Sequence, residues 1–227
     1  MTRKILTTGW TAVLCACAPQ GDRQSPARTG GAPAVEASAT DTTPAVVFLG
    51  TSLTAGLGLD PAEAYPALIQ RKLDSAGIRL RVVNAGLSGE TAAGGLRRLD
   101  RLLDLPVRVV VIELGANDAL RGQDLGATRR TLQEIITRAR ARRPDAHLVL
   151  AGMEAPPNLG AAYTREFREL FRGLARANGV SLIPVLLEGV AGVPELNQED
   201  GIHPTAEGHR RMADNVWQVL QPIVRPR

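Results

Sequence analysis

The chain has few cysteine, histidine and aromatic residues. Its 227 residues include two cysteines, three histidines and only 3% aromatics. Cys15 and Cys17 both lie near the amino terminus, so the rest of the chain has no disulfide, thiol nucleophile or cysteine metal site. The scarcity of aromatic side chains also leaves no stacking platform for single-stranded nucleic acid. The chemistry of the folded part must therefore use other side chains.

A strong excess of one charge is absent too. The formal net charge is +4, and Arg3 and Lys4 at the amino terminus account for two of these charges. Arginines gather at 97–101 and 138–143, where they alternate with small, apolar or acidic residues at helical spacing. That spacing is typical of solvated helix faces. We therefore expect no nucleic-acid partner.

The amino-terminal segment has the features of an export signal. Arg3 and Lys4 precede a short apolar stretch that is too short to span a bilayer and ends in LCAC at 14–17. The pattern Leu-x-Ala-Cys resembles the lipobox of bacterial lipoproteins, in which Cys17 would be acylated. We predict a lipoprotein-type signal peptide at 1–17, with the lipid on Cys17 as the only membrane attachment. Ordinary periplasmic or secreted export, or a misassigned start, are the alternatives.

The next segment predicts a tether rather than a fold. Residues 18–44 are rich in Pro, Gly, Ser, Thr and Ala, and Val35 is their only large aliphatic residue. Such a segment cannot bury enough apolar surface to offset its ordering entropy. We therefore predict one globular domain at 45–227, preceded by a flexible tether.

Strand-like and helix-like patterns alternate along this domain. Short apolar runs typical of buried strands occur at 45–49, 80–83, 107–114, 147–151 and 181–184. Amphipathic stretches between and after them predict helices at 62–75, 94–104, 125–142, 163–178 and 205–224. Helical connections between strands imply an α/β domain whose five-stranded parallel sheet is covered on both faces.

This topology brings chemically useful residues to one edge. Sites form at the carboxyl ends of parallel strands, and Ser52, the glycines at 86–89 and Asn117 follow the first three strands. The loop after the fifth strand carries Asp200 and His203, whose spacing places both side chains on one side of a turn. A hydroxyl, an imidazole and a carboxylate are what a serine hydrolase requires.

Each of these residues also has an ordinary structural interpretation. Ser52 alone could cap a helix, and His203 before a proline could begin the last helix. Asp200 and His203 could ligate a metal, but no third ligand has a suitable spacing, so we expect no metal. We expect Asp118 to be structural. The two remaining histidines, His147 and His209, are expected in packing or at the surface.

Four sequence blocks together resemble the SGNH (GDSL-type) esterases and lipases. In chain order they are GTSLTAG at 50–56, NAGLSGET at 84–91, GAND at 115–118 and DGIHP at 200–204. The resemblance extends from Val46 to about Trp217. Within the family, the chain is most similar to the bacterial periplasmic group with thioesterase, lysophospholipase and arylesterase activities.

The resemblance implies a fold and a set of residue roles. The fold is a flavodoxin-like three-layer sandwich. Ser52 would be the nucleophile, His203 the general base and Asp200 the residue that orients His203. The oxyanion would be stabilised by backbone N–H groups of Ser52 and Gly89 and by the side chain of Asn117. No cofactor is implied, and the substrate would be a small-molecule acyl or aryl ester, thioester or lysophospholipid.

One residue departs from the family pattern. Thr51 stands where the family's name motif has Asp, and we expect its hydroxyl to make a local hydrogen bond in the turn. An α/β-hydrolase is excluded, because its G-x-S-x-G elbow would need glycine at the position of Thr54.

The acyl side of the site is expected to be an apolar groove. The apolar region 186–196 is expected to contribute to it. The predicted substrate-binding residues are Leu53, Ala116, Leu120, Met153, Pro157 and Leu159.

Two other functions stay open at this point. The chain could transfer the acyl group to a sugar or peptide acceptor, or it could be a non-catalytic binding lipoprotein. Acyl length, leaving group and oligomeric state do not follow from the sequence.

Overall fold

The computed structural model describes residues 42–155 and 157–225, and the structural statements below concern this part of the chain. The predicted signal peptide, Cys17 and nearly all of the predicted tether lie outside it. Among the described helices, none combines the length and the apolar character needed to cross a membrane.

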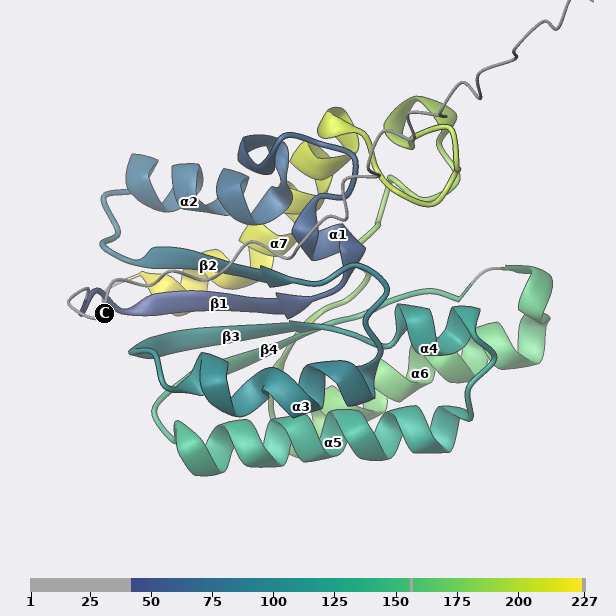
Figure 1. The fold of residues 1–227 in the computed structure, drawn as a ribbon, viewed down its shortest axis with the longest axis horizontal. Helices are drawn as coiled ribbons and strands as arrows, with labels where there is room; N and C mark the ends of the chain where they lie inside the picture. Colours follow the sequence, from purple (N-terminus) through teal and green to yellow (C-terminus); the bar gives the residue numbers. More distant parts are fainter. Residues whose placement is uncertain (1–41, 156, 226–227) are drawn as a thin grey trace, which may run out of the picture. The chain divides into compact units, whose positions relative to one another are not determined.

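Five parallel strands form a single sheet in the order β2-β1-β3-β4-β5 (Figure 1). This is the flavodoxin-like order, which confirms the predicted fold class. The strands are β1 (Ala45–Gly50), β2 (Arg81–Gly86), β3 (Val107–Glu113), β4 (His147–Ala151) and β5 (Ser181–Ile183). The second strand extends three residues beyond the prediction, because residues 84–86 still pair with residues 48–50 of β1.

Helices cover both faces of the sheet. In Figure 1, α2 and α7 lie on one side, whereas α3, α5 and α6 lie on the other. The long helices are α2 (Tyr65–Ser75), α3 (Ala92–Leu103), α5 (Leu125–Arg142), α6 (Ala161–Asn178) and α7 (Ala206–Val224). The short elements are α1 (Ser52–Ala55), α4 (Ala116–Leu120) and the 3-10 helices η1 (Pro61–Glu63), η2 (Pro157–Leu159) and η3 (Pro194–Leu196). Most of the short elements follow the carboxyl ends of strands, at the right in Figure 1.

Two predicted helix starts were displaced by local chemistry. The helix expected from residue 62 is interrupted at Ala64, which is extended, and α2 begins one residue before Pro66. Proline lacks an N–H for continuing a helix from the preceding turn but fits the first turn of a new one. Helix α3 begins at Ala92 because the side chain of Thr91 accepts a hydrogen bond from Gly94 N.

Strand β1, which lies between β2 and β3, is buried along its whole length, as expected for a parallel strand covered on both faces. Its neighbour β3 is equally buried at its carboxyl end, where four apolar residues precede Glu113. Glu113 is fully buried and is an ionisable residue at the end of an otherwise apolar run. This carboxyl group therefore lies at the edge where the strands end.

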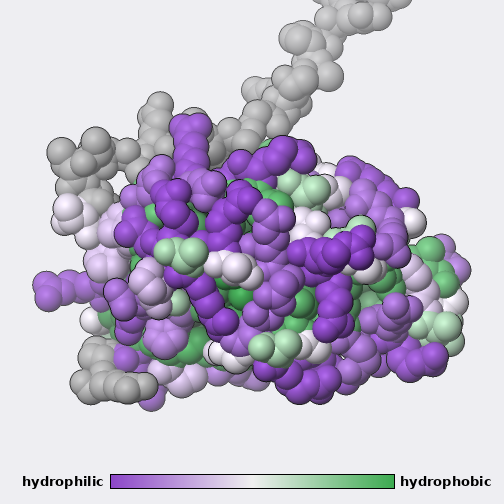
Figure 2. Space-filling view, turned by 90° about the horizontal axis from the view of Figure 1, so that it is seen from below, coloured by the Kyte–Doolittle hydropathy of each residue, from purple (hydrophilic) through white to green (hydrophobic). Residues whose placement is uncertain are grey.

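The arginine clusters mostly lie on the helix surface, as predicted. Arg138 and Arg142 form ion pairs with Asp100 on α3, so basic and acidic side chains alternate there. Figure 2, viewed from the side of α3 and α5, shows a mainly hydrophilic face. Arg98 is different, because it forms an ion pair with Glu90 next to the carboxyl edge. The helical spacing alone did not distinguish this arginine from its solvated neighbours.

Two glycines let α1 approach the sheet. A Cβ at Gly86 would lie 2.2 Å from Ala55 N, and a Cβ at Gly50 would lie 2.0 Å from Thr54 Oγ1. Because the obstacle at Gly86 is backbone, no side-chain movement could relieve it. The short helix that carries Ser52 therefore depends on glycine at the ends of β1 and β2.

We predict that Gly86→Ala lowers the thermal midpoint, because α1 must move away from β2. Overpacking of this kind typically costs about 1–3 kcal/mol. Gly173→Ala in α6 is the matched control, since its Cβ would have no contact closer than 3.4 Å. That control should be stabilised by about 0.5–1 kcal/mol, as for alanine in a helix interior. Equal thermal midpoints for the two variants would contradict the close packing of α1 against the end of β2.

Candidate active site

Ser52 lies at the first position of α1, directly after β1. Thr51 is extended and precedes the helix, and Gly56 in the left-handed conformation ends it after four residues. The turn is thus very short, and it places the Ser52 side chain at the carboxyl edge of the sheet. The serine is half-buried.

The structure brings Ser52, His203 and Asp200 into one hydrogen-bonded chain. Ser52 Oγ lies 2.9 Å from His203 Nε2, and His203 Nδ1 lies 2.6 Å from Asp200 Oδ2. The other carboxylate oxygen, Asp200 Oδ1, accepts hydrogen bonds of 2.9 Å from the backbone N–H groups of Ile202 and His203. Ser52 is therefore connected to two residues about 150 positions later in the sequence, in the order expected from the resemblance.

The charge of Asp200 determines how the protons are arranged. Hydrogen bonds from the backbone and side chain of His203 hold the pKa of Asp200 well below its ordinary value. An ionised Asp200 can only accept, so His203 carries its proton on Nδ1 and leaves Nε2 free to accept from the Ser52 hydroxyl. This tautomer is the one in which the imidazole can take the serine proton.

The loop that carries Asp200 and His203 is closed by its own hydrogen bonds. Gln198 N donates to His203 O at 2.7 Å, and Gly201 in the left-handed conformation donates to Gln198 O at 2.8 Å. The Gln198 side chain also donates to Leu57 O, just after α1, at 2.8 Å. The loop is therefore attached directly to the segment that follows Ser52.

The predicted oxyanion residues lie in the adjacent loops. Gly89 has a positive φ of 77°, which favours glycine, and its carbonyl accepts a hydrogen bond from Arg121. Asn117 lies in the first turn of α4 and donates from Nδ2 to Glu90 O at 2.9 Å. Within the described residues, no hydrogen-bond acceptor contacts the backbone N–H of Ser52 or Gly89.

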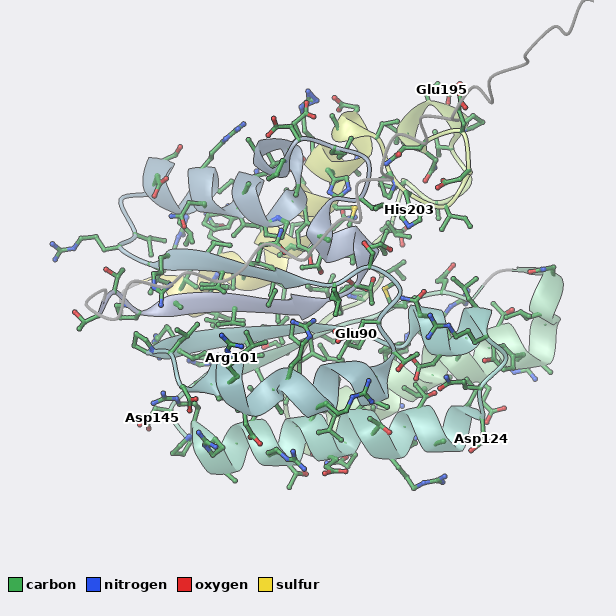
Figure 3. All side chains as sticks on the ribbon, viewed as in Figure 1. Glu90, Arg101, Asp124, Asp145, Glu195 and His203 are labelled. Atoms are coloured by element: carbon green, nitrogen blue, oxygen red, sulfur yellow. The ribbon has the colours of Figure 1, made fainter. Side chains whose placement is uncertain are left out.

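Glu90 connects the Gly89 loop to β1. Its carboxylate forms an ion pair with Arg98, and Arg98 Nη2 donates to Gly50 O at 3.1 Å. Figure 3 shows Glu90 and His203 toward the carboxyl ends of the strands, with Arg101 and Asp145 toward the opposite ends.

Asp118, beside Asn117, is buried and accepts a hydrogen bond from Ala92 N, which agrees with its expected structural role.

A buried carboxyl group lies beneath the serine turn. Glu113 Oε2 accepts hydrogen bonds from Thr51 N and Thr54 Oγ1, both at 2.8 Å, and Glu113 Oε1 accepts from Thr51 Oγ1 at 3.0 Å. Thr54 Oγ1 also lies 2.7 Å from the hydroxyl of buried Tyr65. Burial raises the pKa of Glu113 to about 7, and the hydrogen bonds from Thr51 and Thr54 oppose only part of that increase.

This contact corrects the expectation for Thr51. Its hydroxyl was expected to bond locally within the turn, but its partner Glu113 is 62 residues away. The reason is that β1 and β3 are neighbours whose ends align, with Gly50 opposite Glu113 in the register. Sequence reasoning also missed Glu113 itself. The available signal was a single acidic residue at the end of a strand that is otherwise apolar.

The buried histidine of α7 supports the other side of the site. His209 Nδ1 accepts from Tyr65 N at 3.0 Å, and the two rings stack with centroids 6.2 Å apart. Burial, with a smaller contribution from His203, lowers the pKa of His209 to about 4. This side chain is therefore neutral and packs in the core, which agrees with the expectation from the sequence.

Part of the predicted substrate surface belongs to the core. Leu53 is 6% exposed, and Leu186 and Val190 are fully buried, so these side chains contribute to packing, whereas the rest of the region at 186–196 is exposed or partly exposed. Met153 is 4% exposed, although it lines a cavity of about 190 Å³ together with Val185 and neighbouring residues. Periodicity in the sequence could not separate these two roles, because both use apolar residues.

Other predicted substrate residues lie closer to solvent. Leu120 and Leu159 are exposed, whereas Ala116 is partly buried against the core. Pro157 begins η2, and its side chain lies outside the described part. The large exposed hydrophobic residues of the described chain each follow a different strand: Leu57, Leu87, Leu120, Leu159 and Ile202.

A much larger cavity lies at the opposite edge of the sheet. Its volume is about 970 Å³, and it is lined by residues at or near strand starts, including Leu80, Arg108, His147 and Ser181. Because Ser52 is at the other edge, this cavity has no part in the chemistry of the serine. The size of a cavity is therefore a poor guide to the active site in this fold.

The sequence matches a family model described as the GDSL-like Lipase/Acylhydrolase family over residues 48–211. That range contains all four motifs. Esterase TesA of Pseudomonas aeruginosa is 41% identical over 180 residues, which cover 79% of this chain and 89% of the relative. Thioesterase 1/protease 1/lysophospholipase L1 of Escherichia coli K12 is 38% identical over 189 residues, which cover 83% of this chain and 87% of the relative.

Solved structures agree with these matches. A crystal structure of TesA aligns with a TM-score of 0.76 at 40% sequence identity, and the alignment covers 79% of this chain and 99% of that structure. The overall fold is therefore shared with a protein of known structure.

We predict that His209 makes the fold sensitive to acid. The pKa of His209 is lowered from 6.5 to about 4, so the unfolded chain takes up a proton first as the pH falls. The stability that the neutral ring contributes is complete above pH 6.5 and is lost toward pH 4. The loss is about 2–3 kcal/mol, allowing for partial solvent screening.

Denaturant unfolding at pH 7 and pH 4.5 would measure this effect. His209→Gln keeps an acceptor for Tyr65 N but does not titrate, so the stability of the wild type relative to this variant should fall from pH 7 to pH 4.5. This comparison cancels the opposite contribution of Glu113, whose raised pKa favours the folded chain as the pH falls. The pKa of Asp200 is lowered as well, but its stability contribution is lost only below pH 3.8, outside this window. An unchanged pH dependence in the variant would rule out His209 as the source.

Proposed function

The chain belongs to the GDSL-like lipase and acylhydrolase family, and from this we propose that it hydrolyses carboxylic esters through an acyl-enzyme on Ser52. Its relatives are esterases and thioesterases, which agrees with the family resemblance found in the sequence. The observation that carries the assignment of roles is the hydrogen-bonded chain from Ser52 through His203 to Asp200.

In the first step, Ser52 Oγ attacks the acyl carbon and His203 Nε2 takes the serine proton. Asp200 holds the imidazole in the required tautomer and stabilises the imidazolium that forms. His203 then gives the proton to the leaving group. A water molecule, activated by the same imidazole, attacks the acyl-enzyme and releases the acid.

The oxyanion of each tetrahedral intermediate needs donors that are already oriented. The backbone N–H groups of Ser52 and Gly89 suit this role because neither has an acceptor within the described part of the chain. Asn117 Nδ2 would provide the third donor, and its bond to Glu90 O fixes the orientation of the amide. An amide has two N–H groups, so one remains for the substrate.

The substrate class follows from the surface around the serine. The five exposed hydrophobic residues, one after each strand, give the carboxyl edge apolar side chains that suit an acyl group. Relatives named esterase, thioesterase, lysophospholipase and arylesterase indicate that oxygen and sulfur leaving groups both occur in this family. We propose acyl and aryl esters as the main substrates, with thioesters and lysophospholipids as further candidates.

We predict that Ser52→Ala abolishes turnover and that Asn117→Ala lowers kcat by about 10²–10³-fold, because one oxyanion donor is lost. Rates on p-nitrophenyl acetate, butyrate, octanoate and palmitate would test both variants and define the preferred acyl length. Asn178→Ala is the control, since this amide lies at the far end of α6 and pairs with Gln133. Turnover that survives in folded Ser52→Ala would contradict the proposed nucleophile.

We also propose that the enzyme is exported and attached to the periplasmic face of a membrane by a lipid on Cys17. The support is the basic start and the LCAC sequence at 14–17. Cys17→Ser should move the activity from the membrane fraction to the soluble fraction of cells that express the full chain. If the unmutated protein is already soluble and its Cys17 carries no lipid, the anchor is wrong and simple export remains.

A further inference from the structure

Glu113 occupies a position that is unfavourable for the stability of the fold. It is fully buried, and no cation forms an ion pair with it within the described residues. Burial raises its pKa from 4.5 to about 7, so at pH 8 the folded chain must keep an unpaired carboxylate away from water. An uncharged glutamine of the same shape would avoid this desolvation. The stability of the fold therefore does not explain why position 113 is a glutamate.

The contacts of Glu113 are concentrated on the serine turn. Its carboxylate accepts from the backbone N–H and hydroxyl of Thr51, which precedes the serine, and from the hydroxyl of Thr54, which follows it. Thr51 O in turn accepts from Ala55 N at 2.9 Å. Thr51 is therefore held at its nitrogen, its side chain and its carbonyl oxygen.

These three contacts determine the direction of one N–H group. The peptide unit between Thr51 and Ser52 is planar, so the N–H of Ser52 must point opposite to the carbonyl of Thr51. That carbonyl is directed along α1 by its bond to Ala55 N. Any rotation of Thr51 about its backbone would turn the Ser52 N–H away from the substrate.

We infer that Glu113 is a positioning residue whose carboxylate holds Thr51 and Thr54 and thereby orients the backbone N–H of Ser52 toward the oxyanion. This inference rests on the proposed function, since it assigns to Ser52 N–H the role of an oxyanion donor. Glu113 acts only through the two threonines. Thr51, which stands where the family's motif has Asp, donates to Glu113 where a second carboxylate would repel it.

Several other ionisable groups lie around the same turn. Tyr65 on α2 reaches Thr54, and its pKa is raised well above the ordinary value by burial and by Glu113. His209 on α7 stacks on Tyr65 and is neutral near pH 8. Glu90 and Arg98 form a pair whose arginine contacts Gly50 O. The raised pKa of Tyr65 and the lowered pKa of His209 keep both side chains neutral between pH 7 and 8, so neither affects a comparison at pH 8.

Glu113→Gln separates positioning from stability, because the two quantities should change in opposite directions. At pH 8 the variant should be more stable, with a thermal midpoint raised by about 5–10 °C, since no buried carboxylate remains. Its kcat should fall about 10–100-fold, because the amide offers one acceptor oxygen where the carboxylate offers two. KM for p-nitrophenyl butyrate should stay within about twofold.

The pH dependence of stability provides a second readout. Because the pKa of Glu113 is raised in the folded chain, its contribution is most favourable below pH 4.5 and is lost as the pH rises through about 7. The difference in thermal midpoint between Glu113→Gln and the wild type should therefore grow from pH 5 to pH 8. A difference that does not depend on pH would mean that Glu113 stays neutral, and the inference would be overturned.

Matched threonine variants complete the experiment. Thr51→Val should lower kcat, Thr51→Ser should restore it, and Thr128→Val should leave it unchanged. Thr128 is an equally buried threonine in α5 that does not contact the serine turn. An unchanged kcat in folded Glu113→Gln, or a parallel fall of kcat and stability at pH 8, would refute the positioning role. If wild type itself shows no turnover dependent on Ser52, the failure lies in the proposed function.

Discussion

The close approach of α1 to the ends of β1 and β2 is the constraint on which the site depends. Gly50 and Gly86 leave room for the backbone and side chains of the serine turn, and any Cβ there would overlap it. Asn84 on β2 also holds the turn in place, because its Nδ2 donates a hydrogen bond to Thr54 O at 2.9 Å. Because α1 is only four residues long, it has almost no stability of its own. The turn is held by the sheet beneath it, which is why the serine can lie at the edge without a long supporting helix.

The site combines an exposed acid with a buried one. Asp200 is 47% exposed and keeps its charge through hydrogen bonds from its own loop, so it needs no burial to orient His203. Glu113 is buried and has only neutral donors around it. Asp200 thus keeps its charge while exposed to solvent, whereas Glu113 accepts hydrogen bonds from the serine turn while buried beneath it. A buried ionisable group that destabilises the fold, as Glu113 does beneath the serine turn, is typical of a functional site.

Much of the architecture was predictable because its signals are local. The apolar runs at 45–49 and 107–114 have the length and composition of buried parallel strands, and their alternation with amphipathic stretches implies the sheet. The motif residues were predictable as a group, since each follows a different strand and all strands end at one edge. The helix starts at Tyr65 and Ala92 were less predictable, because they depend on a proline in one case and on a threonine cap in the other.

By itself, the sequence determined the fold class and the family. It also determined that Ser52, Asp200 and His203 lie at the same edge of the sheet. The reason is that strand periodicity and each motif depend only on residues near one another in the chain. The tertiary structure alone decided which apolar residues are exposed after the strands and which fill the core, as with Leu120 and Leu53. It also decided that Thr51 bonds to Glu113 rather than within its own turn. The physical reason is that burial and hydrogen-bond partners depend on the register of β1 against β3, which pairs residues more than sixty positions apart.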